Sequence, residues 1–218
     1  AVQRLIVTSA TYRQDSRIHA DLLRRDPQNV LLARGPRLRL PPHTLRDQAL
    51  AVSGLLVERI GGPSVMPYQP DKHWENLSNM KYEQSSGEDL FRRSLYTYWK
   101  RTLAPPSMLV LDAADRENCA VNPKRTNTPL QALTLLNEKA FVEAARNLGE
   151  RMLREGGPQL QDQVEFAWKS VTARDPREQE KEILTEALAS YRSEFSATPD
   201  LADKLIRIGE SPVPDDLD

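Results

Sequence analysis

The hydrophobic positions of this chain recur with the period of an α-helix along most of its length. The first long stripe has the i, i+4, i+7, i+11 spacing that places side chains on one helical face. Its members are Leu45, Ala49, Val52 and Leu56. We expect this helix to end at Gly61 and Gly62, because glycine adopts the left-handed conformation that closes many helices. At the start of the chain, Val2, Leu5 and Ile6 predict a further amphipathic helix.

A second helix is predicted to begin at Ser86, with Asp89 in its first turn and with Pro105 and Pro106 beyond its end. Its buried face would carry large apolar and aromatic side chains. These are Phe91, Leu95, Tyr98 and Trp99. Basic residues lie between the aromatic ones, as on some nucleic-acid-binding surfaces. The helical spacing of the aromatic residues favours core packing instead.

The third predicted helix has the best-defined start. Thr128 and Gln131 form a capping box, and Pro129 occupies the first helical position, where a missing N–H group has no cost. We expect one long helix from Pro129 to the glycines at 156 and 157. Its apolar face would comprise Leu133, Leu136, Ala140, Ala144, Leu148 and Met152.

Three shorter helices complete the prediction. The first is indicated by an apolar stripe from Leu160 to Val171. The second follows a capping signature at Asp175 and carries apolar residues from Leu184 to Phe195. The last follows Thr198. No alternating β pattern exceeds four residues, so the predicted fold is all-α, an irregular helical bundle with long ordered loops. We expect a main helical domain over residues 1–157, truncated at its N-terminus, a helical extension over 158–208 and a flexible acidic tail over 209–218.

Two regions do not have a helical pattern. Residues 26–42 are rich in arginine and proline, and residues 61–87 form a 27-residue connection. Such long connections are usually functional or disordered. Tyr68, Trp74 and Tyr82 favour an ordered loop that packs over the bundle.

Composition excludes several classes of function. The net charge of −1 creates no field that would attract nucleic acid or anionic lipid, so no nucleic-acid partner is expected. The single cysteine, Cys119, excludes an internal disulfide, a multi-cysteine zinc site and covalent c-type haem. The three histidines lack metal-ligand spacing, so we expect no metal and no cofactor in this chain. No apolar run approaches the roughly 18 residues of a membrane span.

Polar residues are concentrated in the connector over residues 112–127. Asp112, Asp115 and Glu117 could act as general acid and base or bind a hard cation. We favour the alternative that they pair with neighbouring cations such as Arg116 and Arg125 and cap helices. Cys119 could be a nucleophile only if a base reached its sulfur, and a small buried hydrophobic role is favoured.

Binding candidates lie in the same connector and in two other places. The connector candidates are Arg116, Asn122, Arg125 and Asn127. Tyr68 and Trp74 could stack on sugar rings or anchor a protein, or could instead form a lid that closes the core. Arg37, with Arg34 and Arg39, could bind an oxyanion, although pairing with the chain's own 31 acids is favoured.

Six ordered blocks of sequence resemble one known family. The blocks are SATYRQ (9–14), LLARGPRLRL (31–40), LRDQALAVSGLL (45–56), GGPSVMPYQP (61–70), RRSLYTYWKRT (92–102) and NPKRTNTPLQALTLLN (122–137). They resemble the planctomycete-type domain of unknown function 1553. The resemblance implies the C-terminal domain of a large exported protein that often carries cytochrome-c-like modules. It therefore implies an extracytoplasmic location, with haem only in modules upstream of this chain.

We interpret the chain as a noncatalytic binding or scaffolding module of such a multidomain protein. The absence of an initiator methionine agrees with a fragment of a longer chain. Its expected partner is a protein or a glycan, besides the other domains of the parent chain. The alternative is a hydrolase of extracellular polysaccharide that uses Asp112, Asp115 or Glu117.

Overall fold

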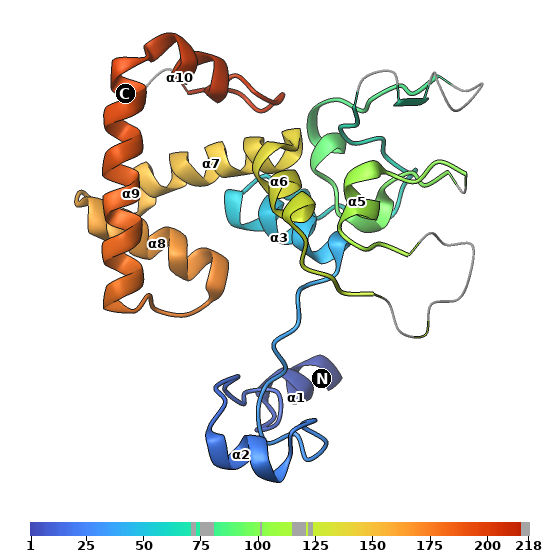
Figure 1. Cartoon of the computed structure of the whole chain (residues 1–218). Coiled ribbons are helices and arrows are strands. Elements are labelled where there is room, and N and C mark those ends of the chain that lie inside the picture. Colours follow the sequence, from blue (N-terminus) through green and yellow to red (C-terminus); the bar gives the residue numbers. More distant parts are fainter. Residues whose placement is uncertain (71–72, 75–80, 101, 115–120, 122–123, 215–218) are drawn as a thin grey trace. The chain divides into compact units, whose positions relative to one another are not determined.

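The computed structural model describes residues 1–70, 73–74, 81–100, 102–114, 121 and 124–214. The chain divides into two compact units, Ala1–Leu40 and Pro41–Asp218, and each is considered by itself (Figure 1). The described residues form α-helices and short 3₁₀ helices, with isolated β-bridges but no strand. The predicted all-α fold is confirmed. The domain boundaries predicted at residues 157 and 208 stay predictions.

The first unit contains α1 (Val2–Thr8) and α2 (Ala20–Arg25). Asp26 follows α2 and is buried, and its carboxylate accepts hydrogen bonds of 2.8 Å from the N–H groups of Val30 and Leu31. The Arg34 guanidinium donates to the backbone carbonyls of Asp26 and Pro27. Polar contacts to the backbone therefore hold this loop, and no hydrophobic residue of the unit is buried.

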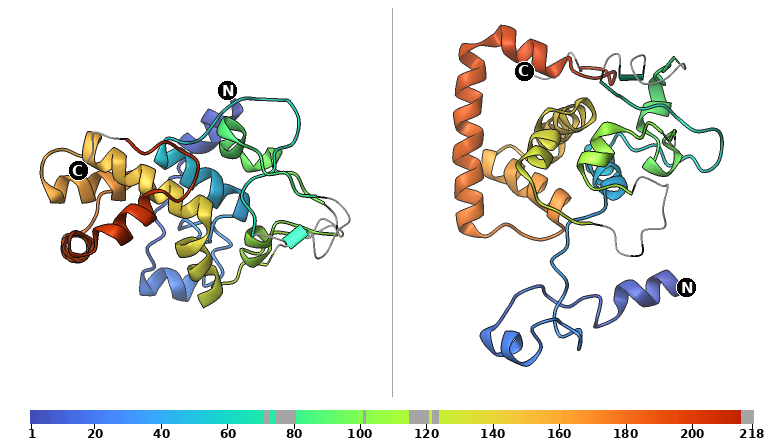
Figure 2. Two further views of the ribbon diagram at one scale, coloured as in Figure 1. Left: turned by 90° about the horizontal axis from the view of Figure 1, so that it is seen from above. Right: turned by 45° about the vertical axis from the view of Figure 1, so that its right-hand side comes forward.

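In the second unit, α3 (Pro42–Ser53) packs against α7 (Lys139–Glu155), and α8 (Leu160–Thr172) lies against both (Figure 2). The shorter α6 (Pro129–Asn137) contacts α7 on one side and α5 (Pro106–Val110) on the other. Leu50 from α3 and Ala144 from α7 are among the buried residues between these helices. A second group of buried residues joins Tyr68, Leu90 and Ala140.

The end of α3 differs from the prediction. The helix ends at Ser53, and Gly54 closes it in the left-handed conformation with φ of 79°. The N–H groups of Leu55 and Leu56 both donate to the carbonyl of Leu50, so the chain turns away at this point. Leu56 therefore lies beyond the helix, although its position in the sequence continues the apolar stripe.

The prediction of a helix after Ser86 is wrong. The segment forms two 3₁₀ helices, η1 (Gly87–Phe91) and η2 (Ser94–Tyr96), joined by extended residues. Its backbone groups bond to distant segments: the N–H of Val65 donates to Tyr96, and the N–H of Tyr98 donates to Val65. These long-range partners replace the i to i−4 bonds of a helix, which a periodic apolar pattern alone cannot reveal.

The long helix predicted from Pro129 is interrupted at Glu138. This residue has an extended backbone, with φ of −70° and ψ of 133°, and separates α6 from α7. Its carboxylate accepts from the N–H groups of Ala140 and Phe141 and so caps α7. Glutamate is not among the preferred N-cap residues, which explains why the break was missed.

The three C-terminal helices are confirmed as α8, α9 (Glu178–Ala197) and α10 (Pro199–Ile206). The cap of α9 is shifted from Asp175, because Glu180 accepts from the N–H group of Arg177. The tail also differs from expectation at its start. Glu210 and Ser211 hydrogen bond to α7 through the carboxylate of Glu143.

Candidate functional site

The connector that follows α5 is closed at its base by Asp112. This residue has a positive φ of 66°, which turns the chain out of the helix. Its carboxylate accepts a 2.6 Å hydrogen bond from the N–H group of Thr126 and bonds of 2.9 and 3.0 Å from the Thr126 hydroxyl. Residues 14 positions apart in the sequence are thereby joined.

Gln131 completes this closure from the first turn of α6. Its buried side-chain amide donates to the Asp112 carboxylate at 3.1 Å, to the Thr126 hydroxyl at 2.9 Å and to the backbone carbonyl of Val110 at 3.0 Å. The capping box with Thr128 is confirmed, because each residue's side chain accepts from the other's N–H group. We call Asp112, Thr126 and Gln131 the neck of the connector.

Within the described residues, the neck shows which groups bind the carboxylate of Asp112. Its two oxygens accept from the backbone and side chain of Thr126 and from Gln131, so the carboxylate fixes the loop and stabilises the start of α6. Arg125 and Asn127 are exposed beside the neck. The other connector candidates lie outside the described residues, and their roles stay predictions. They are Asp115, Arg116, Glu117, Cys119 and Asn122.

The exposed side of α6 is the most apolar surface next to the neck. Leu130 is 58% exposed, Leu133 is 54% exposed and Leu136 is 72% exposed. We call these three residues the leucine face. They recur with helical spacing on a helix of nine residues that contains no charge. Clustered exposed apolar residues of this kind mark interaction surfaces more often than isolated ones do.

An open apolar groove lies between α3, α6, α7 and α8. Its volume is about 230 Å³. Among the described residues of its lining, only Gln48 is polar, and its amide donates to the carbonyl of Val171. The apolar lining includes Leu45, Ala49 and Val52 from α3, Leu135 from α6, and Phe141, Ala144 and Leu148 from α7. The stripe predicted for α3 therefore faces a groove that retains open space.

The second cavity contains ionisable groups but little space. It is about 20 Å³ in volume, room for a single water molecule, and Arg46, Tyr68 and Glu138 contribute to its wall. Burial lowers the pKa of Arg46 and raises the pKa of Glu138. Burial, together with the nearby Glu143 carboxylate, also raises the pKa of Tyr68. A sugar ring does not fit in this cavity.

The aromatic candidates of the 61–87 loop are in the core. Tyr68 is 7% exposed and Trp74 is 2% exposed. The Trp74 ring lies 5.2 Å from that of Tyr82 and 5.9 Å from that of Tyr98, and its indole N–H donates to Gln69. These rings pack in the core, as expected for the alternative of a lid that closes it, and a binding role for Tyr68 and Trp74 stays a prediction.

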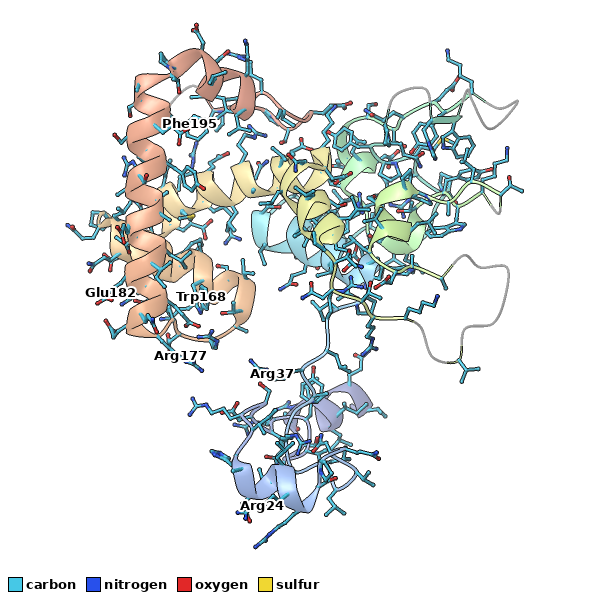
Figure 3. All side chains as sticks on the ribbon, in the orientation of Figure 1. Arg24, Arg37, Trp168, Arg177, Glu182 and Phe195 are labelled. Atoms are coloured by element: carbon cyan, nitrogen blue, oxygen red, sulfur yellow. The ribbon has the colours of Figure 1, made fainter. Side chains whose placement is uncertain are left out.

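Arg37 is an exposed residue of the first unit (Figure 3). Its neighbour Arg34 binds backbone carbonyls, in agreement with a structural role for part of this arginine cluster. Among the described residues, no group of three or more His, Cys, Asp or Glu side chains has the arrangement of a metal site. No described helix is both long and apolar enough to cross a membrane.

No curated protein and no solved structure matches the chain. A family model does match, over residues 1–188, and its description is "Protein of unknown function (DUF1553)". This match covers most of the chain and includes α3, α6, α7 and the neck. The chain therefore belongs to the family of proteins of unknown function DUF1553.

Proposed function

We propose that the chain is a noncatalytic binding module that recognises a protein partner through the leucine face and the groove beside it. The observation that carries this proposal is the neck. Its carboxylate is used to hold the connector closed and to fix the start of α6. A rigid start for a short helix that exposes leucines is the arrangement expected of a docking surface.

The chemistry of this surface favours a protein segment that combines apolar and acidic residues. Residues 121–137 include Lys124 and Arg125 but no Asp or Glu. Both cations are exposed, and they precede the leucine face directly. A partner helix could place its apolar side chains against α6 and in the groove while its carboxylates meet the cations.

A glycan partner has less support than a protein partner. Sugar recognition commonly uses an accessible aromatic face together with polar side chains, whereas Tyr68 and Trp74 are buried. The groove walls are almost entirely apolar. The hydrolase alternative also finds no support among the described residues, because Asp112 holds the neck and the only ionisable cavity described above accommodates one water.

The wider setting belongs to the same proposal. The family resemblance suggests an exported multidomain protein with cytochrome-c-like modules, in which any haem would be bound outside this chain. In that setting the partner would be another domain of the parent protein or a second extracytoplasmic protein.

The test is site-specific photocrosslinking in the native host, with a photoreactive residue at Leu133 or at the control position Leu95. Leu95 is 73% exposed, similar to Leu136, but lies on η2. We expect a discrete adduct from position 133 alone, formed with an acidic, apolar segment. Its yield should decrease at least tenfold with Leu136→Asp and also with Lys124→Glu combined with Arg125→Glu.

Equal adducts from both positions, or an adduct that persists in these variants, would contradict the proposal. A glycan array with the purified chain tests the alternative of a glycan partner. Glycan binding that is unaffected by Leu136→Asp would replace the protein-docking interpretation.

A further inference from the structure

A short segment after α10 is held on α7 by three side chains. We call residues 209–212 the strap and Glu143, Arg146 and Asn147 the clamp. One oxygen of the Glu143 carboxylate, Oε1, accepts three hydrogen bonds from the strap. The donors are the N–H group of Glu210 at 2.7 Å, the N–H group of Ser211 at 2.6 Å and the Ser211 hydroxyl at 2.7 Å.

The carbonyl groups of the strap are bound by the other clamp residues. The Arg146 guanidinium donates to the carbonyl oxygens of Ser211 and Pro212, each at 3.0 Å. The Asn147 amide donates to the Ser211 hydroxyl at 3.0 Å. The clamp therefore recognises consecutive main-chain N–H and C=O groups together with one side-chain hydroxyl. This is the set of contacts by which proteins bind an extended peptide.

The clamp also specifies glycine at the first strap position. Gly209 has φ of 103°, a conformation that side chains rarely adopt. A Cβ atom on Gly209 would lie 2.2 Å from Cδ of Glu143 and 2.3 Å from Oε1. The Glu143 side chain that this Cβ atom would meet is fully buried. A peptide ligand must therefore contain glycine two residues before serine.

The Tyr68 hydroxyl lies beside the same buried carboxylate, and burial and the Glu143 charge both raise the pKa of Tyr68. Two strap residues, Glu210 and Pro212, are exposed, and the Glu210 carboxylate accepts a hydrogen bond from the amide of the exposed Gln84. A segment held by polar bonds with little apolar burial opens locally at low cost.

We propose that the clamp is a peptide-binding site, occupied here by the chain's own strap and open to other segments that carry Gly-x-Ser. The strap then acts as a competing internal ligand. The middle position tolerates an acidic residue, since Glu210 points to the surface. This site uses neither the neck nor the leucine face, so its test is independent of the proposed docking surface.

The test uses the full chain and a fluorescent peptide with the sequence of residues 207–214, RIGESPVP. Gly209→Val in the chain should release the strap and leave the clamp intact. We expect fluorescence anisotropy to show peptide binding to this variant at least tenfold tighter than to the unmodified chain. The peptide with Gly209→Ala should bind the Gly209→Val chain at least tenfold more weakly than the original peptide does. The original peptide should likewise bind at least tenfold more weakly to a chain that carries both Gly209→Val and Glu143→Gln.

Failure of the original peptide to bind the released chain, or equal binding of the alanine peptide, would overturn the proposal. Hydrogen exchange of the unmodified chain gives a second, independent measure. The N–H groups of Glu210 and Ser211 should exchange at least tenfold faster than that of the buried Ala144. Exchange of all three only by global unfolding would show that the strap is a fixed part of the fold and not a displaceable ligand.

Discussion

In the α3–α7 region two buried arginines bind backbone carbonyls, whereas in the α8–α10 arm the charged side chains lie at the surface and bind one another. Arg92 shows the first pattern. It is fully buried, stacks on the Tyr96 ring at 3.9 Å and donates to the carbonyls of Arg59, Gly61 and Pro63. Arg46 similarly donates to the carbonyls of Leu90 and Arg92.

The arm shows the second pattern. No residue of α9 or α10 is buried. Lys169 and Lys181 both pair with Glu165, at 2.8 and 3.0 Å, and the second of these pairs links α9 to α8. Arg174 pairs with Glu180 at the start of α9. Exposed pairs of this kind contribute little stability and are weakened by salt.

The difference shows that similar residue types fix irregular loops in one region and only support regular helices in the other. The buried arginines replace secondary structure: they satisfy carbonyls that no helix or sheet satisfies. The surface pairs add to helices whose backbone bonds are already made. Removing a buried arginine should therefore affect the whole unit, while removing a surface pair should affect one helix end.

The largest effect is expected from Arg92→Met. This change removes the donors for three carbonyls of the 59–63 segment, so we expect the free energy of unfolding to fall by about 4 kcal/mol. Denaturant unfolding followed by circular dichroism measures the change. Arg93→Met is the matched control, since Arg93 is 56% exposed and makes one ion pair of 3.6 Å; its effect should be at most about 1 kcal/mol. Similar losses for both variants would contradict the comparison.

Leu50→Ala is expected to have the next largest effect. Leu50 is 1% exposed on α3, and its truncation leaves a cavity, so we expect a loss of about 3 kcal/mol. Leu184→Ala on α9 provides the counterpart in the arm. Leu184 is 36% exposed, and its truncation should cost about 1 kcal/mol or less. Equal losses in thermal unfolding would mean that the arm has a core comparable to that of the α3–α7 region.

The sequence was sufficient for the elements whose determinants are local. The capping box at Thr128 and the proline at the start of α10 lie within one turn of the helices they begin, and both were predicted. The break at Glu138 was not predicted, because the apolar spacing continues through it and the cap uses an unfavoured residue type. The helix predicted after Ser86 failed for a similar reason at longer range, since its backbone hydrogen-bond partners are up to 34 residues away.

The candidate site was predictable only in part, for the same reason. The sequence identified the connector and Asp112, but the acceptor role of Asp112 depends on Thr126 and Gln131 being folded back upon it. The clamp was missed entirely. Glu143 resembles any charged residue on an amphipathic helix, and the strap has no periodicity. Nothing in the local sequence therefore indicates that the Glu143 carboxylate binds an N–H group 67 residues away.

Thr128→Ala tests the smaller contribution of the helix cap at the start of α6. Its hydroxyl accepts from Gln131, so we expect a loss of about 1 kcal/mol in thermal unfolding. Thr198 precedes α10 but makes no side-chain cap, and its hydroxyl instead donates to the carbonyl of Glu194. Thr198→Ala should therefore cost less than Thr128→Ala. The reverse order would show that the start of α6 does not depend on its cap.

The smallest effect should appear on acidification of the arm. Hydrogen bonds from the Arg174 side chain and the Arg177 N–H group lower the pKa of Glu180 to about 2, from its ordinary value of 4.5. Because the folded state holds this carboxylate ionised, the contribution of Glu180 to α9 is complete above pH 4.5 and is lost as the pH falls toward 2. NMR signals of the first turn of α9 should therefore show fraying over this interval, and Glu180→Gln should remove the pH dependence. Since the pair is exposed, 1 M salt should reduce the difference between the two chains. If the pH-dependent fraying is unchanged in Glu180→Gln, another carboxylate causes it. If the pH dependence is lost in this variant, the Glu180 pair supports the end of α9, as the comparison of the two regions predicts.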